Sequence, residues 1–180
     1  TSSSTTTMLI NVNNVTVKNI EIHNTNTISA SKNLLVGNSG QYGGNFVLDS
    51  CFATSTYAKT VLLESGARHA LVKDCTVTQT NAGATEYCLR TNDWGGTTMT
   101  VQDCYIETLS TQSGCKSVML AGSGAEVLKR CIVKATAGAH GIRITSTAKI
   151  SSCLVIGKST PITGTKGIFR QGGPEWTSQV

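Results

Sequence analysis

Side chains that could act on a sugar polymer occur at three separated points of this 180-residue chain. Glycosidic hydrolysis needs two carboxyl groups about 5 to 9.5 Å apart, and Glu64 with Asp93 is the pair that we would test first. His140 could serve as a general acid or base, although a structural hydrogen bond in a turn is its simpler role. These catalytic candidates can meet only if the fold stacks distant segments.

Other residues could bind such a polymer without reacting with it. Trp94 lies in a wide turn and could stack on a sugar ring, but an isolated turn tryptophan is as often packed locally. Arg90 and Arg143 are the candidate anion contacts, and Arg90 could equally form an ordinary surface ion pair with Asp93. We expect no metal site and no cofactor, because acidic residues are dispersed, C-x-x-C is absent and the histidines lack zinc-ligand spacing.

A repeat explains how these residues could be positioned. Six segments share the pattern apolar, polar, small or polar, key residue, any residue, apolar. The key residue recurs after 31, 24, 29, 27 and 22 residues, at Ile20, Cys51, Cys75, Cys104, Cys131 and Cys153. Periods in this range are typical of stacked units, each burying its face on the next.

The residue before each key position is expected to form a tight bend. Apolar residues in these segments are spaced by three and then two, whereas a flat strand keeps a period of two. The expected bend residues are Asn19, Ser50, Asp74, Asp103, Arg130 and Ser152. Asn and Asp tolerate the left-handed conformation that such a corner needs, and Arg130 fits it less comfortably.

A second family of apolar runs lies between the key segments and predicts another strand in each repeat. These runs are residues 34–36, 61–63, 87–90, 118–120, 142–144 and 168–170, each followed by a turn rich in Gly, Asn and Ser or by the chain's tail. Together with the strands before and after the bend, these runs give three short strands per coil. In the run 87–90 we expect a one-residue shift that turns Tyr87 and Leu89 inward and Cys88 and Arg90 outward, because a core arginine would be costly.

The key cysteines are expected to be buried free thiols. Stacked at the strand spacing of about 4.8 Å, their parallel Cβ vectors are poorly arranged for a disulfide, which needs Cβ atoms about 3.8 Å apart. They would act as small apolar core residues, and they favour folding in a reducing compartment.

The arrangement resembles the right-handed parallel β-helix of the pectate-lyase-like superfamily. The likeness implies an all-β solenoid of about six coils over residues 11–170, with a polar lead-in over 1–10 and an irregular tail over 171–180. Thr91-Asn92-Asp93 and His140-Gly141-Ile142-Arg143-Ile144 are similar to motifs of polygalacturonase-type glycosidases, but the paired aspartates of that family are absent. We therefore do not expect that hydrolytic activity.

Two outward columns are expected to be mostly apolar. One contains Glu21, Phe52, Thr76, Tyr105, Ile132 and Leu154, and the other contains Leu35, Leu62, Met119, Arg143 and Phe169. Such columns form either a subunit interface or a surface that loops cover. The column before the bend, with Lys18, Asp49 and Lys73, is expected to be solvated.

The chain most resembles a segment of a phage tailspike, in which three β-helices stand side by side. This predicts a homotrimer that contacts bacterial surface polysaccharide, located on the virion after folding in the host cytoplasm, and part of a longer protein. The alternatives are a polysaccharide hydrolase or lyase and a secreted structural adhesin without catalysis. The net charge of +5 is scattered and no long apolar run occurs, so we expect neither nucleic-acid binding nor membrane insertion.

Overall fold

A computed structural model describes most of the chain. The described residues are 6–26, 31–37, 43–57, 59–64, 66–80, 87–92, 98–112, 114–121, 125–135, 139–145, 148–156, 162–163 and 168–170. All the regular elements in these ranges are β-strands, which form three parallel sheets. We call these sheets A, B and C in the order in which the chain enters them.

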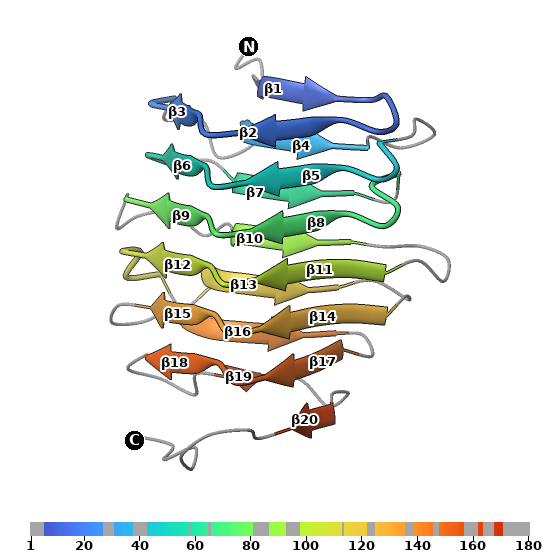
Figure 1. Cartoon of the computed structure of the whole chain (residues 1–180). Coiled ribbons are helices and arrows are strands. Elements are labelled where there is room, and N and C mark those ends of the chain that lie inside the picture. Colours follow the sequence, from blue (N-terminus) through green and yellow to red (C-terminus); the bar gives the residue numbers. More distant parts are fainter. Residues whose placement is uncertain are drawn as a thin grey trace.

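Each sheet takes one strand from every coil (Figure 1). Sheet A contains β1 (Thr6–Ile10), β4 (Lys32–Val36), β7 (Lys59–Leu63), β10 (Tyr87–Thr91), β13 (Lys116–Leu120), β16 (His140–Ile144) and β19 (Ile162–Thr163). Sheet B contains β2 (Thr16–Lys18), β5 (Val47–Asp49), β8 (Leu71–Lys73), β11 (Thr98–Gln102), β14 (Ala125–Lys129), β17 (Ala148–Ser151) and β20 (Ile168–Arg170). Sheet C contains β3 (Glu21–Asn24), β6 (Phe52–Ser55), β9 (Thr76–Gln79), β12 (Tyr105–Thr108), β15 (Ile132–Ala135) and β18 (Leu154–Ile156).

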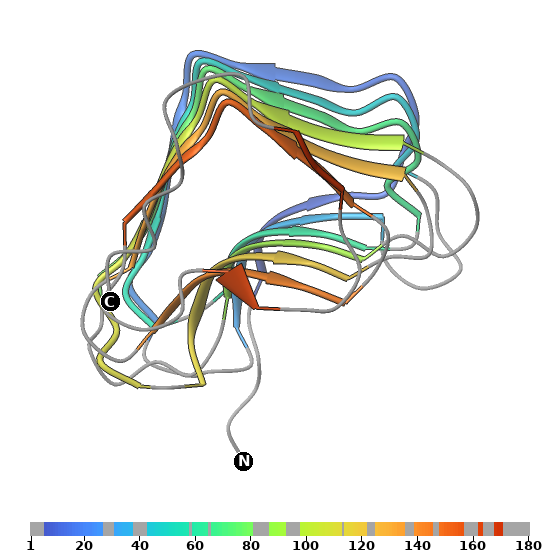
Figure 2. The same ribbon diagram turned by 90° about the horizontal axis from the view of Figure 1, so that it is seen from below.

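The chain winds as a right-handed solenoid, with the three sheets forming the walls around one core (Figure 2). The expected parallel β-helix with three short strands per coil is confirmed. The count of coils differs slightly from the expected six, because sheets A and B each contain seven described strands and sheet C contains six. β1 lies within the range expected to be a polar lead-in.

One strand assignment was wrong at the C-terminal end. The run 168–170 was expected in sheet A, but β20 pairs with β17 of sheet B, where Phe169 lies opposite Ile150. β19 takes the sheet A position and pairs with β16. Ile162–Thr163 is too short to show a period, so the longer run was assigned to its place.

The key positions from Cys51 onward line the core, whereas Ile20 in the first coil is 37% exposed. Cys51, Cys75, Cys104 and Cys131 are only 1–4% exposed, Cys153 is half-buried, and all are free thiols. Each of these thiols donates a hydrogen bond to the carbonyl two residues earlier, at 3.0–3.3 Å. That carbonyl also accepts a backbone hydrogen bond from the bend residue of the preceding coil, as Lys73 O does from Ser50 N at 3.1 Å, so the cysteine fills the slot and adds a second donor to an acceptor that is already paired.

The bend itself is confirmed at every expected residue. Asn19, Ser50, Asp74, Asp103, Arg130 and Ser152 have φ values between 51° and 54°. Arg130, the least suited of them, forms a bidentate ion pair with Asp103 of the preceding coil, at 2.6 and 2.7 Å. This pair offsets part of the cost of a left-handed arginine.

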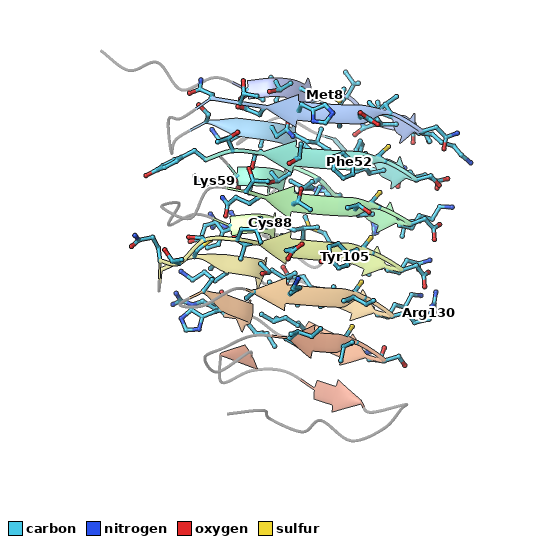
Figure 3. The ribbon with its side chains drawn as sticks, turned by 90° about the vertical axis from the view of Figure 1, so that its left-hand side faces the viewer. Met8, Phe52, Lys59, Cys88, Tyr105 and Arg130 are labelled. Atoms are coloured by element: carbon cyan, nitrogen blue, oxygen red, sulfur yellow. The ribbon has the colours of Figure 1, made fainter. Side chains whose placement is uncertain are left out.

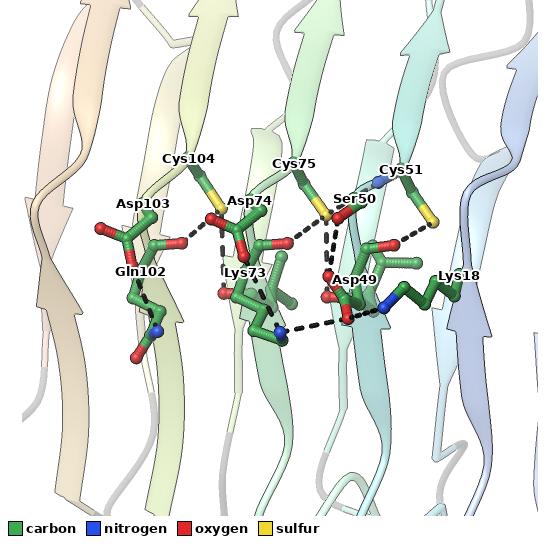
Figure 4. A network of polar contacts seen from close by, with 12 residues as sticks. Lys18, Asp49, Ser50, Cys51, Lys73, Asp74, Cys75, Gln102, Asp103 and Cys104 are labelled. Carbon is green, nitrogen blue, oxygen red and sulfur yellow. Dashed lines mark hydrogen bonds and ion pairs between the residues drawn. The ribbon is translucent and has the colours of Figure 1, made fainter.

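Charged side chains also join neighbouring coils beside the bend (Figure 4). The Asp49 carboxylate accepts a hydrogen bond from Ser50 at 2.8 Å and lies 3.1 Å from the Lys73 ammonium and 3.2 Å from that of Lys18. These contacts, chiefly the Ser50 hydrogen bond, lower the pKa of Asp49 to about 2. Asp49 is only 6% exposed, so the solvated face expected before the bend is interrupted here.

Two substitutions at the bend residue Asp74 test whether its positive φ constrains the backbone. Asp74→Val places a β-branched residue at a positive φ and should lower the free energy of unfolding by about 1–2 kcal/mol. Asp74→Gly loses the same long contact with Lys73 but removes the backbone strain, so it should not destabilise the protein. Urea unfolding of both variants measures the contrast, and equal destabilisation would show that the bend imposes no backbone constraint.

The Asp49 network predicts a dependence of stability on acid. The pKa of Asp49 is lower in the folded protein than its ordinary value of 3.8, so its ionised form favours folding. That contribution is complete above about pH 5 and is lost as the pH falls toward 2. Asp49→Asn should therefore be less stable than the parent at neutral pH, and the two should converge in acid. Thermal unfolding across this range tests the idea; a difference that does not change with pH contradicts it.

Candidate functional site

The outer face of sheet A brings basic and aromatic side chains into register. The first residues of successive strands there are Lys32, Lys59, Tyr87, Lys116 and His140. A second outward column, three residues further along each strand, contains Leu35, Leu62, Arg90, Met119 and Arg143. Two predicted anion contacts, Arg90 and Arg143, and the predicted acid or base His140 thus share one face. We call this the sheet A face.

A kink near the start of each strand determines which side chains reach this face. The second and third residues of the strands both point inward, as Thr60 and Val61 do, and both are fully buried. The second residue is polar or small, and its side chain hydrogen-bonds to carbonyls of sheet C: Asn33 to Ile22 and Thr54, Thr60 to Thr78, Cys88 to Val77 and Ser117 to Lys134. The seam between sheets C and A is therefore polar, and these side-chain donors are satisfied, whereas Asn33 Oδ1 is buried without a hydrogen-bond partner among the described residues.

This kink corrects the register expected for residues 87–90. Leu89 is buried opposite Val61 and Val118, as expected, and Arg90 lies in the outward column. Cys88 was expected to face outward, but it is fully buried, because its thiol bonds to the Val77 carbonyl at 3.3 Å. No shift of register is needed.

Tyr87 was expected in the core and instead forms the centre of a cationic cluster. It is half-buried, with the Arg90 guanidinium carbon 5.2 Å and the Lys116 nitrogen 5.3 Å from its ring centroid. Both distances are within the range of cation–π contacts. The ring holds two cations side by side on neighbouring strands.

Two buried nitrogen atoms of the cluster have unused hydrogen-bonding capacity. Arg90 Nε and His140 Nδ1 have no hydrogen-bond partner among the described residues. An unsatisfied buried polar atom costs free energy, and because both atoms are buried, a ligand on the surface does not reach them directly. Asp49, Asp103 and Glu107 do not neutralise this face, since their ion pairs lie on sheets B and C.

The apolar part of the sheet A face is covered. Leu35, Leu62 and Met119 are only 4%, 1% and 9% exposed, respectively, so of the two alternatives expected for this apolar column, a subunit interface and a covered surface, the covered surface is the one observed. Arg143 remains exposed at the edge of the face. Charged groups, and not an apolar patch, are what this sheet offers to a partner.

The predicted carboxylate pair can be described only in part. Glu64 follows β7, is half-buried and accepts a hydrogen bond from Asn92 Nδ2 at 2.7 Å. Its proposed partner Asp93, and the predicted sugar-stacking Trp94, lie outside the described residues. Glu126, a further carboxylate of this region, is fully buried and accepts a hydrogen bond from the Thr91 hydroxyl at 2.6 Å, so a polymer on the surface would not reach it.

From the sequence, Lys59 and Lys116 were not expected at a site, and Tyr87 was expected in the core. A usable signal was present, because each precedes its inward apolar residue by two positions in successive coils. It was missed because the kink makes strand alternation fail at that point.

Sheet C presents a second surface of different character. Phe52, Ile132 and Leu154 are 37%, 43% and 55% exposed in one outward column, and Tyr105 of the same column is half-buried (Figure 3). The expected exposure of this apolar column is confirmed. We call it the sheet C column.

A polar group lies beside the sheet C column. Glu107 Oε2 accepts a hydrogen bond from the Tyr105 hydroxyl at 2.7 Å, and Glu107 Oε1 lies 2.8 Å from Lys134 Nζ. Burial alone would raise the pKa of Glu107, but the contacts with Lys134 and Tyr105 outweigh it and lower the pKa. This carboxylate is therefore held ionised by its own neighbours.

Comparisons with family models, curated proteins and solved structures found no match for this chain. Within the described ranges, no three or more His, Cys, Asp and Glu residues are grouped to hold a metal ion. In the same part of the chain, no helix has the length and apolar character needed to cross a membrane.

Proposed function

We propose that this chain is the polysaccharide-contacting β-helical portion of a tailspike-like receptor-binding protein. The proposed ligand is an acidic bacterial surface polysaccharide that lies along the sheet A face. The cluster of Tyr87 between Arg90 and Lys116, with His140 and Arg143 beside it, carries the proposal.

The chemistry of this cluster suits a carboxylated or otherwise anionic sugar chain. Guanidinium and ammonium groups form strong charge-assisted hydrogen bonds with carboxylates. Arg143 is exposed and can make such a contact with a polymer on the surface. Because the cations come from successive parallel strands, the positive charge follows the solenoid axis, as a linear polymer requires.

The sheet C column supports association of parallel copies. In a rotationally symmetric assembly of parallel subunits, each residue faces the same level of its neighbours, so Ile132 and Leu154 meet apolar side chains. In an antiparallel pair, Leu154 would instead approach the polar level of Glu21 and His23, whose side chains are hydrogen-bonded at 3.0 Å. We propose a parallel homotrimer, located on the phage tail and folded in the host cytoplasm, where free thiols persist.

The two alternative functions stay open. A hydrolase or lyase would need Glu64 to act together with a second group, and the hydrogen bond from Asn92 leaves Glu64 positioned but already engaged. A secreted adhesin would bind a polymer and leave it uncut. A hydrolase or lyase differs from the proposed function because it shortens the polymer. A secreted adhesin differs because it is not part of a virion.

Neutralising one exposed cation of the sheet A face should weaken binding of an acidic polymer. Arg143→Gln is expected to raise the Kd for polygalacturonate about five-fold, since one exposed charge contact contributes about 1 kcal/mol. Lys149→Gln removes a charge that is also exposed but lies on sheet B, so it should leave the Kd unchanged. Calorimetric titration measures both, with neutral dextran as the non-binding polymer. Equal losses of affinity in the two variants would mean that net charge, not this face, binds the polymer. Shortening of the polymer would instead favour the hydrolase or lyase alternative.

Introducing charge into the sheet C column should dissociate the proposed trimer. Leu154→Asp would bury a carboxylate at the interface and should give monomers by light scattering while the β circular-dichroism signal is retained. Leu9→Asp is the matched control, because Leu9 is 49% exposed but lies on sheet A. A parent protein that is a stable monomer at micromolar concentration would contradict the trimer directly.

A further inference from the structure

A ring of three parallel chains needs two different contact surfaces on every chain. A contact between identical surfaces closes after two copies, whereas a ring of three repeats one contact between unlike surfaces. The sheet C column supplies only one of these surfaces. The second surface of the proposed trimer must therefore lie elsewhere on the solenoid.

Sheet A does not suit the second surface. Its outward apolar residues Leu35, Leu62 and Met119 are covered. Arg143 lies exposed on sheet A in the same coil as Leu154, so packing sheet A against sheet C would bury a guanidinium against an apolar side chain. A neighbour on sheet A would also cover the cations that are proposed to bind the polymer.

Sheet B presents an outward column that contains three partly exposed apolar side chains. Val47, Leu71 and Val127 are half-buried and stand in register, with the half-buried Thr100 between the last two. The residue that follows each of these four in the chain is fully buried, so the column itself faces outward. We call Val47, Leu71, Thr100 and Val127 the sheet B column.

The two columns flank the edge where sheets B and C meet (Figure 2). The sheet B column lies three residues before each bend residue and the sheet C column two residues after it, as Val127 and Ile132 do around Arg130. Their distances from the edge are therefore similar. Three chains that turn this edge toward a common axis would bring the sheet C column of one chain against the sheet B column of the next.

We propose that the trimer closes as a ring of unlike contacts, in which the sheet C column of each chain packs against the sheet B column of its neighbour. This assignment rests on the proposed trimer. Because the copies are parallel, strands of the same coil face each other. Phe52 then meets Val47, and Ile132 meets Val127, so apolar side chains coincide in two coils.

Side-chain sizes are complementary in the two coils between these contacts. Leu71 meets Thr76, and Tyr105 meets Thr100, so a large side chain faces a small one each time. Such interdigitation is what a well-packed interface core requires.

The last described coil of sheet C fits the same arrangement. There Leu154 meets Lys149 of sheet B, which is exposed. The methylene stem of a lysine can cover an apolar side chain while its ammonium group stays in water.

Charges are complementary at the N-terminal end of the contact. Glu21 of sheet C and Lys18 of sheet B belong to the same coil, and their side chains are 73% and 55% exposed. Each also contacts a group of its own chain, Glu21 with His23 and Lys18 with Asp49. Opposite charges on facing surfaces favour this pairing of sheets over a contact between two cationic faces.

Two substitutions at facing positions test the ring. Val127→Asp on sheet B and Ile132→Asp on sheet C should each give monomers by light scattering while the β circular-dichroism signal is retained, because each removes one of the two surfaces. An equimolar mixture of the two variants should form dimers at submillimolar concentration. Sheet C of the Val127→Asp chain and sheet B of the Ile132→Asp chain stay intact in that mixture, so one contact can form but the ring cannot close. Leu9→Asp, with its exposed site on sheet A, is the matched control and should remain trimeric.

The results distinguish the sheet B contact from the trimer itself. A trimeric Val127→Asp variant beside a monomeric Ile132→Asp variant would overturn the contact and leave the trimer intact. A mixture that stays monomeric would overturn the contact as well. A monomeric parent protein would contradict the trimer, and the contact with it. Val47→Asp, in another coil of the sheet B column, serves in both experiments if Val127→Asp does not fold.

Discussion

Six described coils of this protein turn from sheet B to sheet C at a residue with a positive φ, and the rest of the solenoid depends on that bend. It redirects the chain from sheet B to sheet C within a single residue and points the following side chain into the core. The thiol of that following residue donates to the carbonyl before the bend, which also accepts a backbone hydrogen bond from the preceding coil. Because strands of neighbouring coils pair in register, one misplaced bend would displace side chains in the coils on both sides.

A second constraint, the polar seam between sheets C and A, determines the chemistry of the surface. Thr60, Cys88 and Ser117 point inward to bond with sheet C carbonyls, which leaves the residue before each of them on the outside. Lys59, Tyr87 and Lys116 are those residues. The proposed polysaccharide site is thus a consequence of how the core satisfies its backbone carbonyls. A substitution in the seam would therefore shift the cations on the outer surface beside it.

The solenoid assigns different tasks to its walls. Sheet A carries a line of cations over a covered apolar layer, and sheet C carries an exposed apolar column beside the self-neutralised pair of Glu107 and Lys134. A charged polymer and a second copy of the chain could therefore be bound on separate faces without competing.

The sequence by itself determined the coil, the key cysteines and all six bend residues, because these depend on local spacing and on left-handed preferences of single residues. It did not determine that Cys88 is buried, that Leu35 and Leu62 are covered, or that residues 168–170 belong to sheet B. Those outcomes depend on contacts between coils and between sheets, which only the tertiary structure decided. The cationic cluster around Tyr87 arises in the same way, because its members become neighbours only when three coils stack.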